Sequence, residues 1–333
     1  MRRVQLLVGV GARFGTGHSV RMRELRAGLE AGGMQTLWHE LVAFDDASAK
    51  TALDAIMVHG SDGDRNALFV LDARDLNPRP FAVGNAIVLA LDNRHASREK
   101  LLGRRNASDP EREAIQFYDT IPHPRADLSE TLSRVLLGSD VRAIASSARP
   151  RKSRRSLFVY TGDFAVPGLD AALRSMLRTG WSVHRCGSVR PGADVSEEAV
   201  AARPETEDFG DPASRTVDPA PPGFRWSPRL ERREFLRALA VADGVWTYFG
   251  MTLLEAWYLN RGPLLLPVDS RAHTELAEYL HSAAGVPIVE PAELSATLAD
   301  PPEENKASAL RRGPGDQGFD RLIARVRALA AGP

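Results

Sequence analysis

The sequence predicts an α/β protein built from two Rossmann-like, doubly wound domains. Short β-branched runs alternate with helix-length amphipathic segments along the chain, a pattern typical of βαβ units on a parallel sheet. At 333 residues the chain is also too long for one small core. The alternation breaks around 139–155, in a stretch rich in Ser, Ala, Arg and Pro, and then starts again. These observations place a linker near residue 150 between two domains of similar size.

The first half contains four expected strands and one well-defined helix. The run VQLLVGV at 4–10 is continuously apolar, as a strand buried on both faces is. The segment 19–33 spaces Val20, Leu25 and Leu29 at roughly helical intervals and ends in two glycines. The other expected strands are 34–41, 66–73 and 85–92.

The second half repeats the alternation and is interrupted once. Residues 188–222 are rich in Pro, Asp, Glu and Ala and have little apolar periodicity, so we expect a long loop or an insertion there. The expected strands are 156–162, 181–187, 244–249, 262–268 and 286–290, and the expected helices are 168–180, 232–242, 251–260, 272–285 and 319–331. The predicted domains are 1–148 and 156–312, followed by a helical segment, 313–333, for which packing on the first domain is one option.

Charge and cysteine content exclude several classes of protein. Lys+Arg and Asp+Glu number 43 each, so no net charge favours nucleic acid or an anionic membrane as a partner. The basic tract at 149–155 is interpreted as a solvated connector. A single cysteine, Cys186, excludes an internal disulfide framework and a Cys-based zinc site, and fits a reducing cytoplasm.

The N-terminal apolar run is interpreted as a buried strand rather than a signal peptide. It ends at Arg13 without a small-residue cleavage site. No window approaches the roughly 20 apolar residues that span a bilayer. We therefore expect a cytoplasmic protein.

His18 lies where the first strand gives way to a helix. The preceding glycines would let the backbone approach a ligand, and a helix N-terminus favours a phosphate. Their spacing matches neither the dinucleotide fingerprint nor the P-loop. His18 can be a general base, a hydrogen-bond donor or simply a residue that caps the helix. Asp92 and Asn93 follow another strand, where turn chemistry is the common role.

The second half carries a comparable segment after the strand 244–249. Thr252 and Glu255 match a capping box, which needs no ligand. In a functional interpretation, the amides of 250–252 bind a diphosphate and Glu255 accepts hydrogen bonds from ribose hydroxyls. Gly162 and Asp163 likewise end a strand. All these clusters map to carboxyl ends of strands, where doubly wound sheets bind ligands.

Several segments together resemble a family. The segment GTGHSVRMREL at 15–25 resembles the G-x-G-H-x-x-R-x-x-x-L signature of a GT-B nucleotide-sugar-binding group. That group includes the nucleotide-sugar hydrolase of pseudaminic acid biosynthesis and spore-coat polysaccharide glycosyltransferases, and is more distantly similar to the transferase that completes lipid II. LDN at 91–93, YTGD at 160–163 and the segment 242–267 are similar to further motifs of the group, in the same order.

The resemblance implies a GT-B-like architecture, with two Rossmann-like domains facing a central cleft, and metal-independent chemistry. It implies that His18 is the catalytic residue and takes a proton from an acceptor hydroxyl or from water. No metal ligand is expected, and no cofactor apart from the nucleotide sugar that serves as substrate. The substrate-binding residues it implies are Gly15, Gly17, Arg21, Asp92, Asn93, Gly162, Asp163, Gly250, Met251, Thr252 and Glu255.

Three functions remain open at this stage. The first is a glycosyltransferase that uses a nucleotide-diphosphate sugar in surface polysaccharide or glycoconjugate biosynthesis, and the second is a nucleotide-sugar hydrolase. The third is a non-catalytic nucleotide-sugar or protein-binding module, because Phe249 replaces a glycine of the family and is large enough to crowd a diphosphate. The expected partners are a nucleotide-sugar donor and an unidentified acceptor, without nucleic acid and with at most a peripheral membrane contact.

Overall fold

A computed structural model describes most of the chain. The described residues are 2–10, 17–41, 50–51, 53–54, 56, 66–73, 75–103, 114–124, 126–147, 155–189, 222–259, 263–299 and 314–332. The chain divides into two compact units, Met1–Gly138 with Gly315–Pro333, and Ser139–Pro314. The first unit therefore ends at Gly138, ahead of the expected position at 148, and it includes the C-terminal helix.

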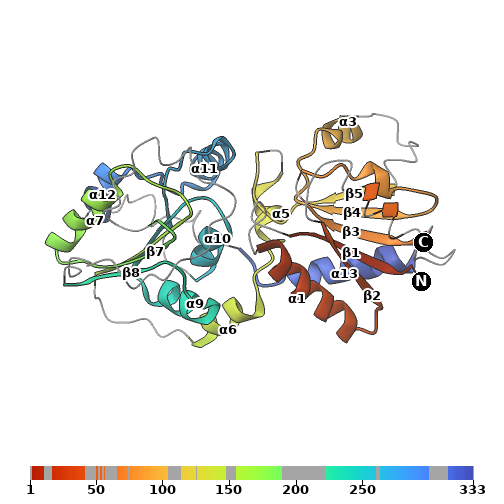
Figure 1. Ribbon diagram of the computed structural model, residues 1–333, viewed down its shortest axis with the longest axis horizontal. Coiled ribbons are helices and arrows are strands. Elements are labelled where there is room, and N and C mark those ends of the chain that lie inside the picture. The colour runs from red at the N-terminus through yellow and green to blue at the C-terminus, as the bar shows by residue number, and fades with distance from the viewer. Residues whose placement is uncertain are drawn as a thin grey trace. The chain divides into compact units, whose positions relative to one another are not determined.

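The first unit is built on a five-stranded parallel sheet (Figure 1). Its strand order is β2-β1-β3-β4-β5, the flavodoxin-like order of doubly wound folds. Because the chain continues in opposite directions on the two sides of β1, the switch point lies between β1 and β3. The strands are β1 (Val4–Gly9), β2 (Thr36–Leu41), β3 (Leu68–Asp72), β4 (Ile87–Leu91) and β5 (Ile115–Tyr118).

Helices cover both faces of this sheet. On one face α1 (Gly17–Ala31) and α13 (Gly318–Ala331) pack side by side over the strands, as Figure 1 shows. Gly28 permits this packing, because a Cβ there would lie 2.4 Å from Cδ1 of Ile323. The other face is packed by residues from η2 (Arg79–Phe81) and α3 (Ser97–Gly103). A short helix, α5 (Leu128–Leu132), follows β5.

The second unit has its own five-stranded parallel sheet, in the order β10-β9-β6-β7-β8. Counted within the unit this is 5-4-1-2-3, the Rossmann order, so the switch point lies between β6 and β9. The strands are β6 (Ser156–Gly162), β7 (Ser182–Gly187), β8 (Phe224–Ser227), β9 (Gly244–Thr247) and β10 (Pro263–Leu265).

Two hydrophobic clusters sandwich this second sheet. One joins it to α7 (Leu169–Arg178) and to the segment formed by η4 (Pro291–Glu293) and α12 (Leu294–Ala299). The other joins it to α6 (Ser139–Ser147), α9 (Arg232–Val241) and α10 (Met251–Tyr258). The long helix α11 (Arg271–Ala284) follows β10. Within the described part of the chain, no helix combines the length and the apolar character needed to cross a membrane.

The structure confirms the expected fold class and differs from the expected elements at several places. Strands β5 and β8 are not in the prediction, because each has four residues and a mixed burial pattern. The expected strand 286–290 pairs only as a single bridge at Ile288, next to Pro287, which has no amide hydrogen to donate. Residues 139–147, assigned to the pattern break, form helix α6, whose Val141 packs against α9. Most of the expected insertion lies outside the described residues.

Candidate functional site

The first candidate site lies at the carboxyl edge of the first sheet, at its switch point. His18 is in the first turn of α1, and Asp72 is the last residue of β3. Asp92 and Thr120 follow β4 and β5. Because all the strands are parallel, these four residues come together at one edge. The carboxyl edge at β1 and β3 is where doubly wound sheets place ligands.

His18 and Asp72 form a hydrogen-bonded pair. The Nδ1 atom of His18 lies 2.7 Å from Oδ1 of Asp72. Asp72 is fully buried, whereas the His18 side chain is 16% exposed. An ionised carboxylate only accepts hydrogen bonds, so Nδ1 carries the proton and donates it, and Nε2 holds the lone pair. A histidine in this tautomer is oriented to accept a proton through Nε2.

Arg21 holds the Asp72 carboxylate from the other side. Its Nε donates to Oδ2 of Asp72 at 2.6 Å, and its Nη2 donates to Oδ1. Burial by itself would raise the pKa of the Asp72 carboxyl, but the nearby guanidinium and His18 hold that pKa well below its usual range. Asp72 is therefore ionised near neutral pH. Nη2 of Arg21 and Nδ1 of His18 lie 3.3 Å apart because both donate to the same oxygen, Oδ1 of Asp72.

Asp92 anchors the neighbouring turn and the far side of Arg21. Its carboxylate accepts bonds from Nη1 of Arg21 at 2.8 Å, from the Thr120 hydroxyl at 2.5 Å and from two backbone amides, those of Thr120 and Ile121. Its backbone is left-handed, with a φ of 48°, which Asp tolerates better than most residues. These four bonds and 4% exposure give Asp92 a structural role in the network. A direct contact of Asp92 with substrate stays a prediction.

Asn93 is also buried and bonds within its own unit. Its amide donates to the carbonyl of Leu76 at 2.8 Å, and its oxygen accepts from the amide of His95 at 3.2 Å. It therefore fixes the loops after β3 and β4 to each other. Gly17 is the first residue of α1, and Gly15 lies outside the described residues.

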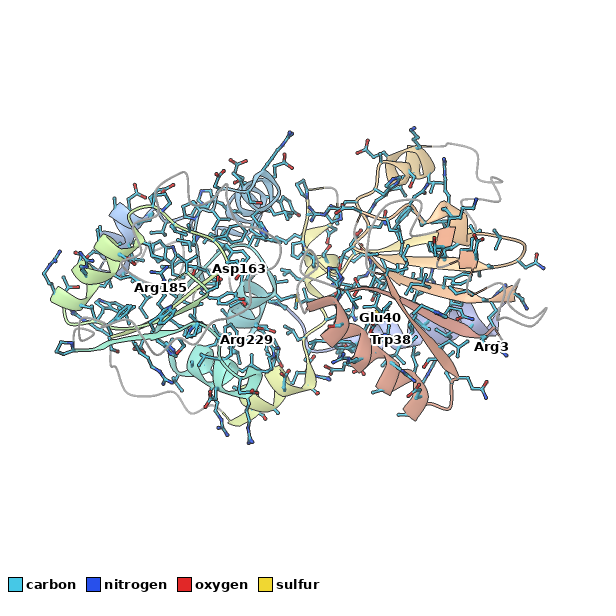
Figure 2. The ribbon with its side chains drawn as sticks, in the orientation of Figure 1. Arg3, Trp38, Glu40, Asp163, Arg185 and Arg229 are labelled. Atoms are coloured by element: carbon cyan, nitrogen blue, oxygen red, sulfur yellow. The ribbon has the colours of Figure 1, made fainter. Side chains whose placement is uncertain are left out.

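The second candidate site lies at the switch point of the other sheet. Gly162 ends β6 in a left-handed conformation, with a φ of 55°, and a Cβ there would lie 2.9 Å from the Tyr248 hydroxyl. Asp163, labelled in Figure 2, follows it and is exposed. Buried hydroxyls at the ends of β6 and β9, those of Thr161 and Thr247, have no hydrogen-bond partner among the described residues. Buried polar groups of this kind usually bond to water or to a ligand.

Helix α10 begins at this same edge with its first amides uncapped by any side chain. Its N-cap is Gly250, and no side-chain cap bond is formed, so the amides of Met251 and Thr252 lack the partner that a capping side chain would supply. Phe249 is 2% exposed, and its carbonyl accepts a bond from Nδ1 of His273 at 2.9 Å. Crowding of a diphosphate by Phe249 stays a prediction.

Glu255 forms a buried ion pair instead of closing a capping box. The capping-box interpretation is wrong because the N-cap is Gly250 rather than Thr252. Arg232 donates to both oxygens of Glu255, from Nη2 at 2.6 Å and from Nη1 at 3.1 Å. Its Nε donates to Asp140 at 2.8 Å. Burial raises the pKa of Glu255, and Arg232 opposes that rise without cancelling it.

An aromatic cluster borders this second site. Tyr248 stacks on Tyr160 with ring centroids 5.8 Å apart, and meets Phe164 and His273 edge to face at 4.9 and 5.2 Å. Burial raises the pKa of Tyr248 well above its ordinary range. The cluster fixes the turn after β9 against the start of α11.

The structure brings the predicted residues together in two separate groups and adds residues that the sequence analysis missed. His18, Arg21 and Asp92 meet in the first unit, whereas Gly162, Gly250, Thr252 and Glu255 belong to the second. The missed residues are Asp72, Thr120, Arg232 and Tyr248. Asp72 carried a readable signal, since it is the polar residue that ends an otherwise apolar strand. Arg232 carried no such signal, because nothing in the sequence ERREF distinguishes it from the adjacent Arg233.

Two parallel, doubly wound sheets in one chain, each with polar residues at its switch point, are the architecture of the GT-B fold. The structure aligns with an S. aureus MnaA–UDP co-structure at a TM-score of 0.55 and 10% identity, over 98% of this chain and 96% of that one. A Neisseria meningitidis UDP-GlcNAc 2-epimerase bound to UDP-GlcNAc aligns at 0.54 and 9%, over 98% and 99%. MurG of Acinetobacter baumannii aligns at 0.51 and 13%, over 98% and 99%.

These likenesses show that the chain has the GT-B fold. No family model matches the sequence, and no curated protein matches it.

Proposed function

We propose that the chain is a glycosyltransferase that uses a nucleoside-diphosphate sugar as donor and requires no metal ion. The observation that carries the proposal is the His18–Asp72 pair at the switch point of the first sheet. Support comes from the GT-B fold, because two of the similar structures hold UDP or UDP-GlcNAc. The acceptor would belong to a surface polysaccharide or another glycoconjugate, as in the transferases that the sequence resembles.

In the proposed reaction His18 is the general base. Its Nε2 takes the proton from an acceptor hydroxyl while that oxygen attacks the anomeric carbon of the sugar. Asp72 keeps the proton of His18 on Nδ1 and stabilises the imidazolium that forms. The bond between the anomeric carbon and the diphosphate oxygen breaks, and its electron pair leaves with the nucleoside diphosphate.

The second unit would bind the nucleotide. The Met251 and Thr252 amides and the dipole of α10 would meet the growing charge on the diphosphate, which removes the need for a metal ion. Glu255 would accept hydrogen bonds from the ribose hydroxyls. Gly162 and Asp163 would line the same side, next to the Thr161 and Thr247 hydroxyls, which have no partner in the part of the chain that the structure describes.

The remaining predicted residues have a supporting part in this proposal. Arg21 and Asp92 would hold Asp72 in place, because Arg21 donates to Asp72, to Asp92 and to Thr120. Gly15 and Gly17 would let the acceptor approach the start of α1.

Calorimetric titration of UDP, GDP, CMP and their sugars into the full chain tests the nucleotide part of the proposal. One nucleoside diphosphate is expected to bind, with and without EDTA, and Glu255→Ala is expected to weaken it by about tenfold or more. Binding of none of these nucleotides by the wild-type chain would overturn the proposal.

Product analysis tests the reaction itself. Incubation of the bound nucleotide sugar in water alone, without acceptor, should release no free sugar if the chain is a transferase. Release of free sugar would assign the nucleotide-sugar hydrolase, in which the same His18 takes its proton from water. A changed sugar configuration would place the chain with the epimerases that share its fold.

A further inference from the structure

Arg232 lies where a positive charge is unfavourable unless it is paired with negative groups. It is the first residue of α9, where the positive end of the helix dipole disfavours a cation. Its neighbour Arg233 is also basic. Arg232 nevertheless makes three charged hydrogen bonds, two to Glu255 and one to Asp140, which outweigh that local cost. The residue is thus held in place by partners on two other helices.

The pair joins an exposed group to a buried one. The Arg232 side chain is 43% exposed, whereas that of Glu255 is 4% exposed. A carboxylate carries about four acceptor directions, and Arg232 uses one on each oxygen. One direction on each oxygen then remains for a ligand that presents two adjacent hydroxyls. Because the Glu255 side chain is almost fully buried, water competes little for such hydrogen bonds.

We propose that Arg232, held by Asp140, is a positioning residue that keeps the Glu255 carboxylate ionised and aims its two oxygens at a vicinal diol of the bound nucleotide. This inference rests on the proposed function, which makes Glu255 the ribose contact. Arg232 acts through Glu255, so it affects nucleotide affinity without taking part in the bond changes at the sugar.

The charges around Glu255 make this role dependent on pH. Among the residues that the structure describes, three ionisable groups interact electrostatically with its carboxylate: Arg232 from α9, Asp140 from α6 and the Tyr160 phenol from β6. Only Arg232 is positive. Without it, burial and the negative Asp140 would both favour the protonated carboxyl, and a protonated carboxyl accepts fewer hydrogen bonds. Loss of Arg232 should therefore weaken nucleotide binding most at low pH.

The test measures UDP and GDP affinity of the full-length chain by calorimetry between about pH 7 and pH 9. Arg232→Met should lower the affinity about tenfold or more near pH 7, and the ratio to the wild type should recover as the pH rises. Arg232→Lys keeps the charge and should restore part of the loss. Glu255→Gln should weaken binding without that dependence on pH, and adding Arg232→Met to it should have little further effect.

Arg233→Met is the matched control, because Arg233 is exposed and lies one residue away on the same helix. It should bind as the wild type does. Thermal melts monitored by circular dichroism establish that each variant is folded, and Arg232→Lys carries the test if Arg232→Met is not. The inference is overturned if Glu255→Gln weakens binding while the Arg232 variants match Arg233→Met at every pH. If the wild type binds none of UDP, GDP, CMP and their sugars, the proposed function fails first, and this role fails with it.

Discussion

Asp72 in the first unit and Glu255 in the second are both buried carboxylates bonded to an arginine, yet their pKa values shift in opposite directions. Burial raises the pKa of each carboxyl. At Asp72 this rise is opposed by the charge of Arg21, which is 7% exposed, and by the hydrogen bond from His18. At Glu255 the opposing charge comes from Arg232, which is 43% exposed and therefore screened by water.

The difference shows that the charges of the two sites are fixed to different degrees. In the first unit Arg21, Asp72 and Asp92 are all buried, and the fixed Asp72 carboxylate sets the tautomer of His18. The second unit holds a carboxylate whose ionisation depends on one exposed arginine. The first arrangement suits a group that must accept a proton in one geometry. The arrangement at Glu255 suits a ligand contact whose charge can change when the ligand binds.

Of the changes considered, replacing His18 should have the largest effect, and that effect is on kcat. His18→Ala removes the proposed base and should lower kcat by about 10²–10⁴. Nucleotide affinity should stay within a few-fold of wild type, because the nucleotide contacts are assigned to the second unit. Steady-state kinetics and calorimetry separate the two effects. His281→Ala is the control and should keep its activity, because the His281 ring bonds to the carbonyl of Val286, just past the end of α11 in the second unit. Unchanged kcat in His18→Ala would return His18 to a structural role.

Asp72→Asn should produce the largest loss of stability. It leaves Arg21 with one carboxylate instead of two in a buried site, and breaking a buried ion pair costs about 3–5 kcal/mol. Urea unfolding measures the change. Asp75→Asn, at an exposed position three residues further along, should stay within about 0.5 kcal/mol of wild type. Equal effects of the two substitutions would show that the network contributes little.

The pH dependence of stability should have opposite signs for the two carboxylates. The folded-state pKa of Asp72 is lowered, so its contribution is complete above the ordinary carboxyl pKa near 4 and is lost as the pH falls. The stability difference between wild type and Asp72→Asn should therefore shrink by at least about 1 kcal/mol as the pH falls from about 4 toward 2.

The folded-state pKa of Glu255 is raised, so its ionisation opposes folding as the pH rises above about 4. The wild type should lose stability relative to Glu255→Gln over that range. Denaturant titrations of both variants and the wild type over this pH range measure both slopes. Slopes of the same sign would contradict the comparison between the two sites.

Gly162→Ala should give the smallest effect, about 1–2 kcal/mol of stability. An alanine there must adopt a left-handed conformation and must also displace the hydroxyl of Tyr248, which the aromatic cluster holds in place. Gly285 is the matched control, because its φ is 68° and a Cβ there meets nothing within 4 Å. Gly285→Ala should cost less than Gly162→Ala in thermal unfolding. Equal costs would show that the close approach at Tyr248 adds nothing to the backbone cost.

Sequence reasoning worked best where one periodicity governs a long segment. The buried strand β1 and the helices α1, α7 and α13 lie within a few residues of their expected bounds. It failed for β5 and β8, which are short and gain their stability from neighbouring strands rather than from their own pattern. It also assigned α6 to the pattern break, although α6 is held by packing on α9.

The sequence by itself determined the fold class, the strand ends that carry polar residues, and His18 as the residue to test first. Each of these depends on local order along the chain: apolar runs, glycine stops and a motif within fifteen residues. Only the tertiary structure decided which side chains pair across the chain. Asp72 lies 54 positions from His18, and Arg232 lies 23 positions from Glu255. Burial then set the charge of each pair, because desolvation and screening depend on what surrounds a group in space and not on its neighbours in sequence.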